Sequence, residues 1–217
     1  SLDILLRHCK NDPICNANFP SLSQNFNELL SRKYPITVKF HHSISEGESH
    51  VELSKAKLVL AIRSILTSPT LTQSLPYLIT QANEGNFQPL LDIIYKINKS
   101  YADGLYDAMM LCVICFEDYP RLSDTRINSN QETFIEDAWM NRVKNACQLW
   151  NPEQLEAKKI KIKKRKVPTL LMSGHRDAAT PPHYGKKILH FLPKSKHLII
   201  ENGGHSFDRM LNCLENI

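Results

Sequence analysis

The sequence predicts an α/β fold in two parts, a mainly helical domain over residues 1–156 and a strand–helix–strand unit over residues 157–217. The early part contains apolar positions at helical spacing and no regular alternation of strands with helices. Near the end, residues 167–172 and 197–200 are apolar runs that flank an amphipathic segment at 184–192. Because parallel strands need a crossover connection, this order predicts two parallel strands joined by a helix.

The helical domain is expected to begin with short helices and a hairpin. Residues 1–10 place leucines on one helical face, and Ser21 is a candidate N-cap for the next helix. Residues 36–41 alternate as a strand does, and the Glu-Gly-Glu sequence at 46–48 is typical of a hairpin turn that returns through Val51. The sequence therefore predicts a small antiparallel sheet within a helical region.

Further helices are predicted over the next fifty residues. One starts at Ser54 and runs through Leu66. Ser74, with a proline in the first turn, starts another helix, which Gly85 ends. Asn86 is then a candidate cap of the following helix.

An apolar run at residues 108–116 is expected to be buried, as either a strand or a helix, because periodicity does not decide so short a run. It ends in Glu117 and Asp118. Charge beside a buried run is costly unless a cation arrives, so these carboxylates either cap the next element and face water or bind a positive group. Residues 121–131 are expected to be a loop, and residues 134–149 another helix.

The net charge of +5 depends on one basic segment, residues 158–166, in which seven of nine residues are Lys or Arg. Such a run can bind nucleic acid, acidic lipid or an importin-like receptor, but it lacks interleaved aromatic side chains, so a solvated connector is favoured and no nucleic-acid partner is expected. No apolar run approaches the roughly 18 to 20 residues of a membrane span. The chain has neither a signal peptide nor an initiator methionine, which indicates a mature product or a fragment.

Asp177 and His205 are the candidate catalytic residues. Each follows a predicted strand, and the carboxyl ends of parallel strands lie at the same edge of a sheet. In a nucleophilic triad a carboxylate orients the imidazole, which takes a proton from the nucleophile. The order of the two residues, with the acid before the histidine, fits such a triad.

The nucleophile of that triad is not evident in this sequence. A serine in a GxSxG turn, before the acid, is expected, but no GxSxG is present. The nearest string, residues 47–51, lacks the second glycine and follows a polar turn instead of a buried strand. The sequence therefore predicts a nucleophile outside these 217 residues.

Six cysteines leave both disulfides and a metal site open. Cys9 and Cys15 flank a short loop, which is compatible with a bridge. Cys112 and Cys115 form a CxxC sequence, but it lies in an apolar run and has no second CxxC, so a metal or redox role is disfavoured. We expect no metal and no cofactor.

These features resemble the C-terminal portion of α/β-hydrolase serine aminopeptidases, the tripeptidyl aminopeptidase and proline iminopeptidase branch. The resemblance rests on PTLLMSGHRDAATPP at residues 168–182, on GGH at 203–205 and on Cys213. It extends into the helical domain through LRHCKNDPICNANFPSL, SLPYLITQANEGNFQPL, YDAMMLCVICFEDYP and ACQLW. Nearly the whole chain is covered, but only the part of the family that follows its nucleophile.

The resemblance implies a helical cap domain over residues 1–156 and the C-terminal part of the hydrolase core over 157–217. It implies that Asp177 is the triad acid and His205 the triad base of a serine peptidase that releases N-terminal residues or tripeptides. Glu117 and Asp118 would then face the active site and bind the α-ammonium group of the peptide substrate.

The resemblance also implies disulfides Cys9–Cys15 and Cys115–Cys147, and hence a secreted or periplasmic protein. The serine would come from an N-terminal hydrolase segment, so this chain is expected to be inactive alone. Two alternatives stay open: a catalytically dead hydrolase remnant or binding module, and a basic surface-binding protein that acts through residues 158–166.

Overall fold

The computed structural model describes residues 2–41, 47–104, 107–121, 133–150 and 163–207. The chain divides into two compact units, which are described separately. The first unit contains Ser1–Arg32, Ile62–Asn86 and Lys161–Ile217, and the second contains Lys33–Ala61 and Phe87–Ile160. The division into domains at residue 156 stays a prediction.

The first unit begins with three helices, α1 (Leu2–Asn11), α2 (Pro13–Asn18) and α3 (Leu22–Ser31). Helix α2 follows a bend at Asp12 and was not predicted from the sequence. Asp12 starts it, because its side chain accepts a hydrogen bond of 2.8 Å from the backbone N–H of Cys15. Helix α3 begins after Ser21 as predicted, although the serine side chain makes no capping bond.

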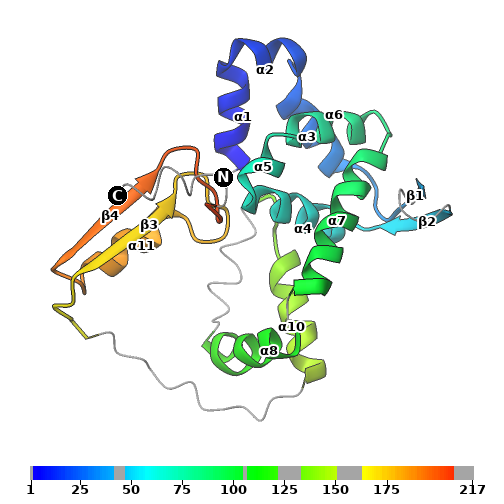
Figure 1. The fold of residues 1–217 in the computed structure, drawn as a ribbon. Helices are drawn as coiled ribbons and strands as arrows, with labels where there is room; N and C mark the ends of the chain where they lie inside the picture. The colour runs from blue at the N-terminus through cyan, green and yellow to red at the C-terminus, as the bar shows by residue number, and fades with distance from the viewer. Residues whose placement is uncertain (1, 42–46, 105–106, 122–132, 151–162, 208–217) are drawn as a thin grey trace. The chain divides into compact units, whose positions relative to one another are not determined.

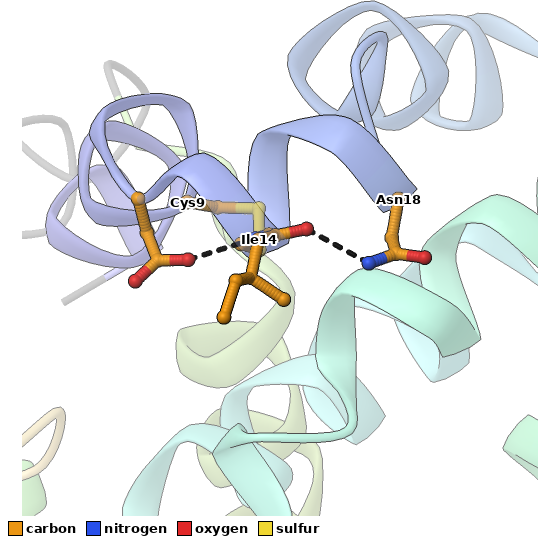
Figure 2. The surroundings of a disulfide bond; sticks show 5 residues. Cys9, Ile14 and Asn18 are labelled. Carbon is orange, nitrogen blue, oxygen red and sulfur yellow. Dashed lines mark hydrogen bonds between the residues drawn. A yellow bond between two sulfur atoms is a disulfide. The ribbon is translucent and has the colours of Figure 1, made fainter.

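The disulfide Cys9–Cys15 joins α1 to α2, and Figure 2 shows its surroundings. Beside it, the Asn18 side chain donates a 2.8 Å hydrogen bond to the backbone carbonyl of Ile14, one turn earlier in α2 (Figure 2). Ile14 itself is exposed. The short helix α2 therefore depends on its cap and the disulfide, because burial contributes little to it.

Two more helices complete the helical part of this unit, α5 (Pro69–Thr72) and α6 (Leu75–Asn83). Helix α6 packs against α3, and the Asn25 amide donates to the Thr80 hydroxyl between them. The start of α6 at Ser74 and its end at Gly85, where φ is +96°, confirm the predicted helix. The fully buried side chains of the first unit come from α3, from α6 and from the helix that precedes α5: Leu29, Ile62, Ile65, Leu75, Leu78 and Ile79.

The end of the first unit is a strand–helix–strand segment, which we call the crossover segment: β3 (Thr169–Gly174), α11 (Pro182–Leu189) and β4 (Ser195–Ile200). The two strands are parallel, with Thr169 opposite Ser195, and α11 packs against both (Figure 1). This confirms the predicted parallel pair and its connecting helix.

The second unit contains the predicted hairpin, formed by β1 (Ile36–His41) and β2 (Glu48–Leu53). Helix α4 (Lys55–Thr67) follows it and continues into the first unit. Helix α7 (Gln88–Gly104) contacts β1, where the Gln88 side chain bonds both the N–H and the C=O of His41. Asn86 was expected to cap α7, but its amide bonds to the Gln81 side chain instead.

The run at residues 108–116 is helical, as α8 (Asp107–Val113) and the start of the π-helical turn Ile114–Asp118. The expectation that the run is buried is wrong: Met109 is 67% exposed, and Cys115 is fully buried. A helical repeat turns only part of such a run toward its neighbour. That neighbour is α10 (Ala138–Trp150), which begins four residues later than predicted.

The disulfide Cys115–Cys147 joins the π-helical turn to α10. Leu111, Ile114, Tyr119 and Trp139 pack around this bridge. The loop was predicted over 121–131, but Arg121 ends a 3-10 helical turn, Tyr119–Arg121. Residues 122–131 of that loop and residues 158–162 of the basic segment lie outside the described residues.

The described strands form two separate two-stranded sheets, so the described residues contain no complete α/β sheet. Among the described helices, none is both long enough and apolar enough to cross a membrane.

Candidate active site

The crossover segment brings Asp177 and His205 together. Asp177 lies in the loop after β3, and His205 lies in the loop after β4. The Asp177 Oδ2 atom is 3.1 Å from the His205 Nδ1 atom, although the residues are 28 positions apart in the chain. The parallel pairing of the strands places both loops at one edge of the sheet, as the sequence predicted.

The Asp177 side chain is only 6% exposed and is bonded at both oxygens. Its Oδ1 atom accepts hydrogen bonds from the backbone N–H groups of Ala179, at 2.7 Å, and Thr180, at 2.9 Å. Its Oδ2 atom accepts from the Thr180 hydroxyl at 2.8 Å, in addition to the contact with His205. The loop therefore satisfies the buried carboxylate and holds it in one orientation.

Burial alone would raise the pKa of Asp177, since it disfavours the charged form. The hydrogen bonds from Thr180, His205 and Ala179 outweigh that effect, and the pKa of Asp177 lies below its ordinary value. Asp177 is therefore ionised at neutral pH and can only accept hydrogen bonds.

His205 is oriented at its backbone and at one ring nitrogen. Its N–H donates a 3.0 Å hydrogen bond to the carbonyl of Thr67, the last residue of α4. Because the carboxylate of Asp177 is an acceptor, the Nδ1 atom must carry the proton in the 3.1 Å contact. The opposite ring nitrogen, Nε2, is then the basic one, and half of the His205 side chain is exposed.

Three glycines allow the two loops to approach. A Cβ atom on Gly174 would lie 2.2 Å from the carbonyl oxygen of Gly204 and 2.5 Å from Gly203. The backbone N–H of Arg176 also donates to the carbonyl of Gly203, at 2.9 Å. The end of β3 and the loop before His205 therefore touch backbone to backbone.

Thr180 is a site residue that the sequence interpretation did not identify. Its hydroxyl bonds to Asp177 Oδ2 and also lies 3.2 Å from His205 Nδ1. A signal was present, because an Asp followed by a hydroxyl residue three positions later is typical of a side-chain-stabilised turn.

A second histidine in the crossover segment, His197, is bonded elsewhere. Its Nε2 atom is 2.8 Å from the Ser173 hydroxyl across the two strands. Gly185 of α11 leaves space for this ring, since a Cβ there would lie 2.6 Å from His197. Ser173 is therefore paired with His197, and it does not bond to His205.

Glu117 and Asp118 end the π-helical turn of the second unit, and both are exposed. They stand two and three residues after Cys115, which the disulfide fixes to α10. Their proposed role in binding a substrate ammonium group stays a prediction.

The described residues contain no group of three or more His, Cys, Asp or Glu side chains that could hold a metal ion. Cys112 is a free, exposed thiol, and Cys213 lies outside the described residues.

An acid and a histidine that meet after neighbouring parallel strands are typical of α/β hydrolases. Comparison with known families agrees with that class: residues 132–217 match the family described as TAP-like protein (Abhydrolase_4). The match includes both Asp177 and His205 and is consistent with the C-terminal part of an α/β-hydrolase. Neither a curated protein nor a solved structure matches the chain.

Proposed function

We propose that this chain supplies the acid and the base of a serine peptidase triad, with Asp177 as the acid and His205 as the base. The observation that carries the proposal is the 3.1 Å contact between Asp177 Oδ2 and His205 Nδ1. An ionised carboxylate at Nδ1 holds the imidazole in the tautomer whose Nε2 accepts a proton, and it stabilises the imidazolium that results.

The proposed nucleophile is a serine of a GxSxG turn on an N-terminal hydrolase segment outside residues 1–217. The size of the β3–β4 sheet supports this assignment. Parallel sheets are normally larger and are covered on both faces, whereas β3 and β4 pair only with each other in the described residues. In this arrangement residues 1–156 form a helical cap, and residues 157–217 complete the core.

The proposed activity is the release of N-terminal residues or tripeptides from peptides. Glu117 and Asp118 are the proposed partners of the substrate α-ammonium group, since a carboxylate gives a charge-assisted hydrogen bond to it. Their position next to the bridged Cys115 supports this role, because a rigid support reduces the entropy lost on binding. The two disulfides support a secreted or periplasmic location.

The test is to join this chain to its GxSxG-bearing segment, as one polypeptide or as two co-purified chains, and to assay a tripeptidyl anilide. We expect hydrolysis with a free N-terminus and much weaker hydrolysis of the N-acetylated anilide. A fluorophosphonate probe should label the added segment and leave residues 1–217 unlabelled.

His205→Ala should lower kcat by about a thousandfold or more, as is usual when a triad member is removed. The matched control is His183→Ala, which removes an exposed imidazole on α11. A labelled serine within residues 1–217 would contradict the external nucleophile. Full activity of His205→Ala would contradict the triad and favour a non-catalytic remnant.

A further inference from the structure

A pocket of about 440 Å³ lies in the first unit, beside the loops that carry Asp177 and His205. Its wall comes from α1, from the end of α4 with α5, and from the loops after β3 and β4. Pockets for small ligands usually measure about 300 to 1,000 Å³. The volume therefore suits one or two amino-acid residues better than a long peptide.

Arg176 is the cation of this pocket. It is half-buried, and its backbone N–H is held by the Gly203 carbonyl at 2.9 Å. No described side chain forms an ion pair with its guanidinium group, and none of the described residues that line the pocket is an Asp or Glu. A half-buried arginine without a described carboxylate partner favours an anion from outside the described residues, and its forked N–H groups match a carboxylate.

The rest of the wall combines polar and apolar groups. His8 contributes an imidazole, and Thr70 and Ser206 contribute hydroxyl groups. Leu66 and Phe207 contribute apolar surface. A peptide that ends in an apolar residue presents a carboxylate next to an apolar side chain. Such an end matches this combination of groups better than an inorganic anion does.

The pocket and the Asp–His pair share their loops. Arg176 directly precedes Asp177, and the pocket residues Gly204 and Ser206 flank His205. The pocket wall is tightly packed at Gly204, because a Cβ atom there would lie 2.8 Å from Pro69. Asp177 and His205 do not line the pocket themselves, so the pocket adjoins the pair through the backbone of the two shared loops.

We propose that this pocket binds the free C-terminal carboxylate of a short peptide, with Arg176 as the anchoring residue. The proposal rests on the peptidase function proposed above and narrows its substrates to peptides whose C-terminus reaches Arg176. An extended chain spans about 3.3 to 3.6 Å per residue, so only a few residues can separate the carboxylate from the reacting bond.

Binding is tested on the chain of residues 1–217 by calorimetric titration with an N-acetylated dipeptide that ends in leucine. We expect the free acid to bind about tenfold or more tightly than the C-terminal amide, as for a charge-assisted pair. Arg176→Gln should remove that difference, and Arg176→Lys should keep part of it, because lysine retains the charge but loses the fork.

Arg7→Gln is the matched control, because Arg7 is exposed on α1 and does not line the pocket, yet its loss changes the net charge equally. Equal binding of acid and amide, or undiminished binding by Arg176→Gln, overturns the proposal. Arg176-dependent binding of inorganic phosphate without binding of the dipeptide also overturns it, in favour of a phosphate site.

This titration does not depend on catalysis. If the dipeptide does not bind but the assembled enzyme is active and loses activity in His205→Ala, only the assignment of the pocket is contradicted. If the dipeptide binds through Arg176 but His205→Ala leaves the assembled enzyme active, only the triad is contradicted.

Discussion

The two sheets of this protein contain strands of equal length, six residues each, but they differ in what they bring together. The hairpin β1–β2 pairs residues close in the chain, and its burial alternates residue by residue. The pair β3–β4 is joined through α11, and its residues are partly buried on both faces. One-sided antiparallel and two-sided parallel sheets show this difference generally.

The connection explains why only one sheet carries the candidate site. A hairpin returns at once, so the end of one strand lies beside the start of the next. A crossover puts both strand ends at one edge, where the loops containing Asp177 and His205 meet. The same edge must accept a close backbone contact, which Gly174 provides.

The largest expected effect is that of Gly174→Ala. The new Cβ would overlap the backbone of Gly203 and Gly204, which cannot rotate away. We expect a loss of about 3 kcal/mol or more in the free energy of unfolding, measured by urea titration. Thr37→Ala on the exposed face of the hairpin should cost at most about 1 kcal/mol. Equal losses of unfolding free energy in Gly174→Ala and Thr37→Ala would contradict this difference between the two sheets.

Asp177→Asn should have the next largest effect. Asparagine can still accept the two backbone hydrogen bonds, but its Nδ2 group cannot accept from Thr180 and His205. Hydrogen bonds to a charged group typically contribute about 1.5 to 3 kcal/mol, so a urea titration at pH 7 should detect the loss.

The stabilising contribution of the Asp177 carboxylate should depend on pH. The pKa of Asp177 in the folded protein lies below its ordinary value of 3.8, so the unfolded chain binds the proton more readily. The stabilising contribution is present above about pH 4 and is lost as the pH falls through the folded-state pKa. The difference between wild type and Asp177→Asn should therefore shrink below pH 4, and a constant difference would contradict this assignment.

A smaller effect is expected from Thr180→Val, which removes the hydroxyl bonded to Asp177. We expect a loss of about 1 kcal/mol in unfolding free energy and a lower kcat in the assembled enzyme. Thr180→Ser keeps the hydroxyl and should restore both quantities. If valine and serine behave alike, Thr180 acts through packing and does not position the carboxylate.

The smallest effect is expected in the hairpin, from Glu48→Gln. This residue forms an exposed ion pair with Lys39, at 3.2 Å. The hydrogen bond and charge of Lys39 lower the pKa of Glu48, but water screens an exposed pair. The midpoint of urea unfolding should not change measurably, and any change should vanish at high salt. A large change would show that the hairpin also depends on specific polar contacts.

Local signals explain the parts of the fold that were predicted. Helix α6 starts after Ser74 with a proline in its first turn, although the serine side chain makes no capping bond, and it ends just before Gly85, whose positive φ is a local preference of glycine. The hairpin and the parallel pair follow from their apolar patterns. The burial of residues 108–116 was mispredicted. An apolar run shows only how much surface can be buried, and the elements that pack against it decide how much of that surface is covered.

The candidate site divides in the same way. The sequence alone indicated Asp177 and His205, since each follows a strand and the order of acid and histidine is visible in the chain. Only the tertiary structure brought the Thr180 hydroxyl to His205 and Arg176 to a pocket whose described lining contains no Asp or Glu. Both arrangements depend on distances between the loops after β3 and β4. The pairing of β3 with β4 sets these distances, whereas the spacing of residues along the chain does not.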